Sequence, residues 1–300
     1  MQQVTLDQSI GLEGINVFNG RNNIVRFHAA PQNTGRVFVV HGNMIPADLE
    51  HAIHYRWLGA STVALEGTRH RAVIVEHTLS ALYALGISNV YIELSDGVCP
   101  RFPRSVSKIV DGLAGHRVSQ DELQHEVTLN PGATNGQRTI EDAERGDRIE
   151  LWPIAGSQIW YDAYYPHKAI GEQQLEVELT ETAYKRHVMN ARAPFFVPFG
   201  MRWLLDTTSH IHGIRDDNAL LIGRRSDVYP LNKGNGRYPH EFVRHKVLDF
   251  IGELALTNQN YVNVLFRCQR TGHGFDLDAM REFITRGVFV PYAEKKEHVA

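Results

Sequence analysis

The segment RYPHEFVRHKVLDFIGEL, residues 237–254, carries two different patterns on one predicted helix. Its apolar side chains recur every three or four residues, as in a helix that packs against a sheet. They are Val243, Val247, Phe250, Ile251 and Leu254. His245, Asp249 and Glu253 follow one another at intervals of four and so form a second face. The apolar stripe predicts a helix buried against a sheet, and the polar face is a candidate site.

The polar face has the ligand types of a metal site. An imidazole and a carboxylate one helical turn apart can reach the same cation, and His-x-x-x-Asp supplies two ligands that zinc accepts. The alternative is a solvated pair of His245 and Asp249 beside Lys246, without a metal. The spacing alone leaves both interpretations open.

Composition excludes several classes of protein. The chain has 300 residues, 43% of them apolar and 22% charged, which predicts a folded protein of two domains, with a single α/β domain as the alternative. A formal net charge of -3 favours neither nucleic acid nor an anionic membrane as a partner. The sequence shows no signal peptide and no run of 18 apolar residues, so we expect a soluble, cytoplasmic protein without a transmembrane segment.

Cysteine usage limits the kind of metal site that is available. Cys99 and Cys268 are the two cysteines and lie far apart in the sequence, so neither a disulfide framework nor a Cys-rich zinc site is expected. Any zinc site must therefore use histidine and carboxylate ligands. Of the 16 histidines, most are expected to serve as ordinary hydrogen-bonding residues.

The first part of the chain predicts antiparallel strands followed by a strand, a helix and a strand. Residues 4–60 contain hairpin patterns such as INVFNGRNN. In AVIVEHTLSALYALGISNVYIEL, residues 72–94, an extended run to Val75 precedes leucines at helical spacing, and alternation returns after Gly86. Glu76 and His77 then lie at the start of the helix, a frequent position for site residues. A short helix is predicted at SKIVDGLAG, and the polar segment 115–125 is taken as a domain boundary.

The second part of the chain repeats this plan. Strands are predicted at EVTLNPG, IELWPI, SQIWYDAYY, QQLEVEL, NALLIG, VYPLN and YVNVLFRCQ, with helices near 180–192, at 237–254 and at FDLDAMREFITRG. His273 lies between two glycines where the last of these strands ends. We therefore expect an α+β fold of two similar domains, residues 1–122 and 123–300, which would be a tandem duplication.

Three segments carry a resemblance to a known family: VEHTLSALYALGISNVYIEL at 75–94, FVRHKVLDFIGEL at 242–254 and TGH at 271–273. They resemble the UDP-3-O-acyl-N-acetylglucosamine deacetylases, zinc hydrolases of lipid A biosynthesis. Weaker similarity, including APQNTG and YPHKAI, extends over nearly the whole chain. The resemblance implies two α+β domains, each an antiparallel or mixed sheet layered against helices, with the active site between them. It also implies one zinc ion per chain, held by His77, His245 and Asp249.

The same resemblance implies roles for the residues around the metal. Three protein ligands leave a position open for water, whose pKa zinc lowers to about 7. Glu76 corresponds to the general base that takes the proton of the attacking water, and His273 to the cationic partner that protonates the leaving amine. Lys246 would add positive charge near the reacting oxygen, and Glu253 would orient His273, in place of the family's Asp. The partner is then a small N-acylated molecule, for which a UDP-amino sugar is a candidate.

The sequence also departs from the family pattern. A threonine hydroxyl that serves as a donor in the family corresponds to Ala193, and one such donor typically contributes about 10²–10³ in rate. The segments LEGINVFNG, CPRFPRSVS and HIHGIRDDNA differ from the family's substrate-contacting loops. These differences favour an amidohydrolase with an altered substrate. The alternative is a non-catalytic zinc-binding or ligand-binding homologue, although such a protein would not need Glu76, His273 and all the ligands together.

Three other features of the sequence each have a functional and a simpler structural interpretation. The sequence His210-Ile211-His212, with Asp216 and Asp217, could form a separate metal site or a polar loop near the pocket. The aromatic residues Trp160, Tyr161, Tyr164 and Tyr165 are expected to pack within a sheet rather than to form a platform for a sugar. Cys268 is expected to be a buried strand residue. No pattern predicts an oligomeric state.

Overall fold

A computed structural model of the 300-residue chain describes residues 1–57, 60–167, 170–197, 213–215, 217–223 and 240–293. The elements of the first half are the strands and helices β1 (Gln2–Leu6), β2 (Ile10–Ile15), β3 (Asn22–Ala29), β4 (Arg36–Val40), β5 (Asn43–Pro46), β6 (Ala52–Trp57), β7 (Ala60–Glu66), β8 (Arg71–Val73), α1 (Val75–Ala84), β9 (Val90–Leu94), α2 (Ser107–Leu113), the 3-10 helix Ala114–His116 and β10 (Arg117–Leu123).

The elements of the second half follow a similar order. They are β11 (Glu126–Leu129), β12 (Thr139–Asp142), β13 (Asp147–Pro153), β14 (Gln158–Tyr165), β15 (Gly171–Glu178), α3 (Glu181–His187), β16 (Ala193–Val197), β17 (Ala219–Gly223), α5 (Glu241–Ala255), β18 (Asn260–Tyr261), β19 (Val264–Gln269), α6 (His273–Thr285) and β20 (Phe289–Pro291).

The two halves contain sheets of the same topology. The strand order is β2-β3-β9-β4-β5 in the first half and β12-β13-β19-β14-β15 in the second. In both sheets the middle strand is antiparallel to one neighbour (β3 or β13) and parallel to the other (β4 or β14). In both halves the strand inserted in the middle follows a long helix, α1 before β9 and α5 before β19. These shared connections agree with the predicted duplication. Both sheets contain parallel and antiparallel pairs of strands and are therefore mixed.

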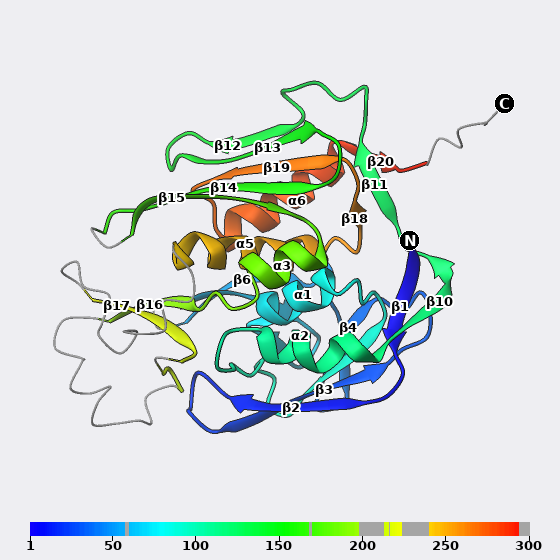
Figure 1. Ribbon diagram of the computed structural model, residues 1–300, viewed down its shortest axis with the longest axis vertical. Coiled ribbons are helices and arrows are strands. Elements are labelled where there is room, and N and C mark those ends of the chain that lie inside the picture. Colours follow the sequence, from blue (N-terminus) through cyan, green and yellow to red (C-terminus); the bar gives the residue numbers. More distant parts are fainter. Residues whose placement is uncertain (58–59, 168–169, 198–212, 216, 224–239, 294–300) are drawn as a thin grey trace.

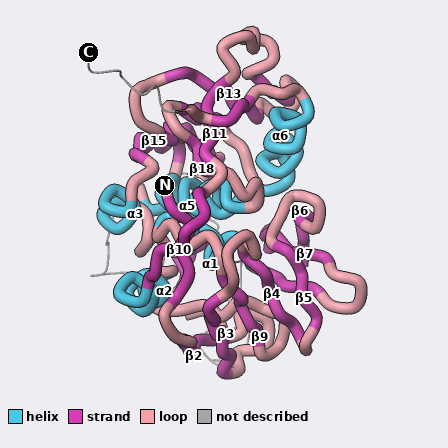
Figure 2. The backbone as a smooth tube through the Cα atoms, turned by 90° about the vertical axis from the view of Figure 1, so that its right-hand side faces the viewer, coloured by secondary structure: helices cyan, strands magenta, loops and turns pink. Residues whose placement is uncertain are grey.

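The helices α1 and α5 lie between the two sheets, and each half packs its own sheet against them (Figure 1). Figure 2 shows α5 and α6 on the side of the second half and α1 and α2 on that of the first. The buried apolar residues of both halves form a continuous cluster, which includes Leu79 and Leu82 of α1 and Val247 and Phe250 of α5. The α+β fold expected from the sequence is therefore correct.

The helix α5 is buried on both of its faces because it lies between a sheet and α1. The predicted apolar stripe packs in the core, and His245, Asp249 and Glu253 are buried as well. The alternative of a solvated pair of His245 and Asp249 is therefore wrong. A buried imidazole and two buried carboxylates require partners, which places them at a functional or structural centre.

Some local predictions differ from the structure. The extended run before α1 ends at Val73, because Ile74 adopts a left-handed conformation and the helix begins at Val75. His273 is the first residue of α6, not the end of a strand. Residues 117–123 form β10, which pairs with β1, whereas the polar composition had suggested a connecting segment.

We propose that the domain boundary lies between residues 122 and 123, one residue before β10 ends at Leu123. The support is that β10 pairs with β1, whereas β11 pairs with β18 and β20 of the second half. The predicted strand VYPLN, the start of the segment 237–254 and the candidate metal ligands His210, His212 and Asp216 lie outside the described residues.

Candidate metal centre and catalytic pocket

The start of α1 brings Glu76 and His77 to the interface between the halves. Ile74, the residue before the helix, has a φ of 65°, which is uncommon for a β-branched residue. Its backbone N–H donates to the carbonyl oxygen of Val63 at 3.0 Å, so β7 holds this turn in place. Strain of this kind persists where the surrounding structure fixes it, often at functional sites.

Three of the predicted ligands, His77 from α1 and His245 and Asp249 from α5, come together in space. Their ligand atoms all lie within 4.8 Å of one another. Oδ1 of Asp249 lies 3.4 Å from Nε2 of His77 and 3.2 Å from Nε2 of His245. That buried oxygen has no well-formed hydrogen bond to a described residue. Two imidazole nitrogens and an unsatisfied carboxylate oxygen that converge on one point fit the ligand set of a zinc ion.

The orientation of the His245 ring is fixed by a backbone carbonyl group. Its Nδ1–H donates to the carbonyl oxygen of Ala191 at 3.1 Å, which leaves Nε2 as the atom that faces Asp249. The segment that carries Ala191 is itself fixed by a buried ion pair, in which Arg192 Nε lies 2.8 Å from Oε1 of Glu241 at the start of α5. The orientation of the His245 ring therefore depends on the Ala191 carbonyl group and, through it, on the ion pair of Arg192 and Glu241.

The electrostatics of this cluster match ligand chemistry. Burial lowers the pKa of His245 to about 3, only partly opposed by the charge of Asp249, so the imidazole is neutral at pH 7. Burial alone would raise the pKa of Asp249, but the nearby imidazoles of His245, His77 and His273 stabilise the ionised form of its carboxyl group and lower that pKa below its usual range. A neutral imidazole and an ionised carboxylate are the protonation states that a metal requires.

Glu76 is buried and its carboxylate is held by the neighbouring strand β7. Oε1 accepts a hydrogen bond from the hydroxyl of Thr62 at 2.6 Å, and Oε2 accepts one from the backbone N–H of Val63 at 3.1 Å. Oε1 also lies 3.8 Å from Nε2 of His77. A carboxylate fixed beside a candidate metal ligand is placed to accept a proton from a molecule bound there.

His273 lies on the other side of Asp249, paired with Glu253. Nδ1 of His273 is 2.6 Å from Oε1 of Glu253, and its Nε2 is 3.9 Å from Oδ2 of Asp249. Burial lowers the pKa of His273, but the Glu253 hydrogen bond and the charge of Asp249 outweigh it and raise that pKa to about 9. Burial, and then the nearby carboxylate of Asp276, raise the pKa of Glu253. The pair therefore holds a proton through neutral pH.

Asp276 was not predicted from the sequence. It is buried on α6, one turn after the start of that helix, and its backbone N–H donates to the carbonyl oxygen of Gly272. The available signal was a carboxylate three residues after His273 on a predicted helix, which places both side chains on similar faces. Lys246 lies close to Gly272, the residue before α6, because a Cβ atom at position 272 would lie 3.6 Å from Nζ of Lys246.

A second set of groups, Glu76, Asp249 and His273, also has ligand atoms within 4.8 Å of one another. The first set fits a metal better because His245 is already oriented by Ala191, whereas His273 and Glu76 are engaged by Glu253 and by β7. Glu76 and His273 do not belong to the first set but lie next to it, near His77 and Asp249 respectively.

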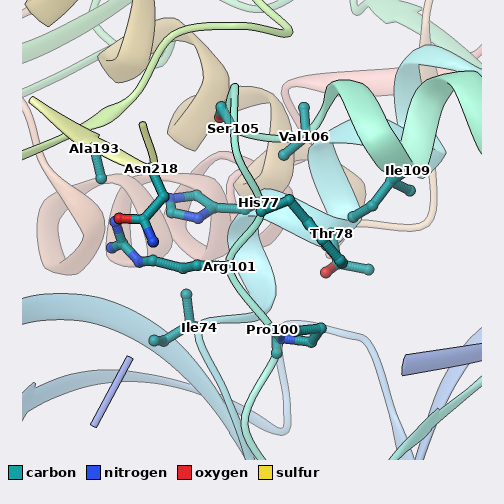
Figure 3. Close-up of a pocket in the computed structure, with 12 residues that line it drawn as sticks. Ile74, His77, Thr78, Pro100, Arg101, Ser105, Val106, Ile109, Ala193 and Asn218 are labelled. Atoms are coloured by element: carbon teal, nitrogen blue, oxygen red, sulfur yellow. The ribbon is translucent and has the colours of Figure 1, made fainter. Parts of the chain in front are cut away.

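A small pocket opens next to His77 (Figure 3). Its free volume is about 20 Å³, and its other lining residues are Ile74, Thr78, Cys99, Pro100, Arg101, Phe102, Ser105, Val106, Ile109, Ala193 and Asn218. Ala193 therefore lies at the site, as predicted, and offers a methyl group there. Arg101 is a lining residue that the sequence reasoning did not single out, although it belongs to the altered segment CPRFPRSVS.

The other features have structural explanations. Tyr161 is buried in the sheet and its hydroxyl donates to the carbonyl oxygen of Thr271, while Trp160 and Tyr164 stack with Arg267 and Arg270. Both cysteines are free and buried, as expected. Among the described residues, none of the helices has the length and apolar character needed to cross a membrane.

Comparisons with known proteins agree with this geometry. Residues 3–285 match the profile of the family described as UDP-3-O-acyl N-acetylglycosamine deacetylase. A protein of Acidithiobacillus ferrooxidans, named UDP-3-O-acyl-N-acetylglucosamine deacetylase, is 32% identical over 99% of this chain and 95% of its own length. Proteins of the same name from Thermodesulfovibrio yellowstonii and Chromohalobacter salexigens are 28% and 30% identical, over 96% and 92% of this chain and 93% and 88% of their own lengths.

Proposed function

Since the chain belongs to the UDP-3-O-acyl-N-acetylglucosamine deacetylase family, we propose that it is a zinc-dependent hydrolase that removes an N-acetyl group from an acylated amino sugar. The observation that carries this proposal is the convergence of His77, His245 and Asp249 between Glu76 and the pair of His273 and Glu253. A zinc ion held by those three residues would polarise the amide carbonyl and lower the pKa of water.

The residues of the chain then divide the proton transfers. Glu76, oriented by Thr62 and Val63, accepts the proton of the attacking water. His273, kept protonated by its hydrogen bond to Glu253, donates a proton to the leaving amine. Lys246 adds positive charge next to Gly272, at the start of α6. Burial of all the reacting carboxylates and imidazoles reduces the dielectric screening of these interactions.

The substrate proposal is that the protein deacylates some N-acyl compound better than it deacylates UDP-3-O-acyl-N-acetylglucosamine. Its support is that Ala193 and Arg101, from segments that differ from the family pattern, line the pocket beside His77. A screen of N-acetylated amino sugars by mass spectrometry, with the zinc-loaded protein, tests it. A kcat/KM on the UDP-linked precursor of about 10⁴ M⁻¹s⁻¹ or more, an ordinary value for enzymes, would remove the altered-substrate proposal.

The Glu76→Gln variant tests hydrolysis itself. The amide is nearly isosteric but cannot accept the proton of water, so we expect this variant to keep its zinc and its fold and to lose most of its turnover. Glu66→Gln is a matched control, because Glu66 is an exposed carboxylate that pairs with Arg71. If neither wild type nor variant turns over any compound in the screen, the non-catalytic alternative is correct.

A further inference from the structure

Arg101 is a partly buried cation at the edge of the candidate metal centre, and it forms no ion pair with any residue that the structure describes. Its Nε is buried and has no hydrogen-bond partner, and no ion pair of its guanidinium is found among the described residues. An arginine that gives up water without a protein partner is costly, so such a group usually marks a position for an anion. Burial lowers the pKa of Arg101, and the negative charges of Glu76 and Asp249 oppose this effect.

The side chain of Arg101 lies in the pocket beside His77 and Ala193. Figure 3 shows its guanidinium below Asn218, in the pocket that the His77 ring and Ala193 also line. The side-chain amide of Asn218 is held by the backbone, since Nδ2 donates to the Gly213 carbonyl oxygen and Oδ1 accepts from the Arg215 N–H, and this amide carries no charge. The alanine methyl group has no donor to offer. Arg101 is therefore the cationic donor in this pocket among the described residues that line it.

The backbone of Arg101 is held firmly in place. Its N–H donates to the carbonyl oxygen of Ile15 at 2.9 Å, and its carbonyl oxygen accepts from the Ile15 N–H at 3.0 Å. A Cβ at Gly14 would lie 2.7 Å from the Arg101 carbonyl oxygen, so the glycine permits this close approach. A preorganised cation of this kind needs little rearrangement when negative charge develops next to it.

The pocket has room for a reacting oxygen. The centre of a water-sized group can occupy about 20 Å³ of it, so an oxygen of the acyl group fits next to His77 and Arg101. On the proposed function, such an oxygen becomes negatively charged during the reaction. The hydroxide oxygen bonds to the carbonyl carbon, the π electrons move to the carbonyl oxygen, and the C–N bond then breaks as His273 protonates the amine. Acetate and a free amine are the products, and Arg101 remains protonated throughout.

We propose that Arg101 donates a hydrogen bond to the acyl oxygen that becomes anionic during deacetylation, and to a carboxylate oxygen of the acetate product. This role rests on the proposed function. It adds a hydrogen-bond donor for the oxyanion, which is a role that the proposed function gives neither to the metal ligands nor to Glu76 or His273. The Arg101 guanidinium can also bind a carboxylate group of the substrate. Kinetic measurements distinguish this ligand from the reacting acyl oxygen. Binding of a substrate carboxylate changes KM, whereas binding of the developing oxyanion changes kcat.

The test compares Arg101→Met and Arg101→Lys with wild type in the full-length, zinc-loaded protein. Arg104→Met is the matched control, because Arg104 is an exposed arginine in the same loop. We expect Arg101→Met to keep the zinc content and melting temperature of wild type. Its kcat should fall by a factor of about 10²–10³ with little change in KM, and the kcat of Arg101→Lys should be intermediate. Acetate, titrated by calorimetry into the zinc-loaded protein, should bind wild type and Arg104→Met alike and Arg101→Met at least tenfold more weakly.

The outcomes separate this inference from the proposed function. Absence of turnover by wild type, with every compound of the screen, would contradict the proposed function. If wild type is active and Arg101→Met matches it in both kcat and acetate affinity, the assignment of Arg101 is wrong. A rise in KM with unchanged kcat and unchanged acetate affinity would also overturn it, and would assign Arg101 to a carboxylate of the substrate.

Discussion

Gly252 of α5 lies directly against the backbone of Glu76 at the start of α1. A Cβ at position 252 would collide with the Glu76 carbonyl oxygen and lie 2.7 Å from the carbonyl carbon. The two helices can therefore approach closely only because this residue has no side chain. Since α1 carries Glu76 and His77 and α5 carries His245 and Asp249, the contact sets the distance between the two parts of the candidate metal centre.

We expect Gly252→Ala to lower both stability and metal affinity. The added methyl group meets backbone atoms, which cannot rotate away, so overpacking should cost about 1–3 kcal/mol in the free energy of unfolding. Denaturant unfolding and zinc titration measure the two effects. Gly115→Ala is the control, because no atom lies within 4 Å of its added Cβ. Equal zinc affinity in wild type and Gly252→Ala would show that the spacing of α1 and α5 does not control the site.

The helices that carry the site could be predicted from the sequence, but the packing of those helices against each other could not. The periodicity of residues 243–254 indicated the helix, and the resemblance indicated His77, His245 and Asp249, which the structure brings together. Neither indicated that α5 is buried on both faces, because a stripe of polar residues is normally a solvated face. Burial of that face depends on α1, which is more than 150 residues away in the sequence. The pairing of β10 with β1 is similarly non-local, and the polar composition of residues 115–125 does not indicate it.

Arg101 and Asp276 show a second limit of sequence reasoning. Each is an ordinary charged residue in a polar segment, and nothing in its spacing distinguishes it from a surface residue. Only the fold shows that Arg101 faces His77 across a pocket and that Asp276 is buried near Glu253. The roles of both residues depend on desolvation, a property that the local sequence does not contain.

We expect one zinc ion per chain and its loss in His245→Ala. Removal of the imidazole leaves two protein ligands, too few for a stable site of this kind. Elemental analysis of the purified protein measures the metal, and circular dichroism checks that the variant is folded. The exposed His125 gives a matched control, since His125→Ala should retain the metal. Full zinc content in a folded His245→Ala would assign the metal to the other set, Glu76, Asp249 and His273.

The pH dependence of turnover should report the pair of His273 and Glu253. The pKa of His273 is raised to about 9, so its acid form is present below that pH and is lost as the pH rises through it. Glu253→Gln removes the carboxylate that favours the charged ring, and should lower the pH at which kcat/KM declines by about one unit or more. Glu253→Asp keeps a carboxylate and should shift the profile less. A basic limb at the same pH in wild type and Glu253→Gln would exclude this pairing from catalysis.

The two positions that line the pocket beside His77, Arg101 and Ala193, should be energetically coupled. Ala193→Thr introduces a hydroxyl donor into a pocket where, on our proposal, Arg101 already binds the developing anion. In the wild-type background the added hydroxyl should change kcat little. In the Arg101→Met background it should restore activity, by up to the factor of about 10²–10³ that one oxyanion donor contributes. The double-mutant cycle is measured as kcat on the best substrate of the screen, with zinc content as the check on the site. An equal effect of Ala193→Thr in both backgrounds would mean that the two side chains act on different atoms, and a loss in both would mean that the threonine disturbs β16.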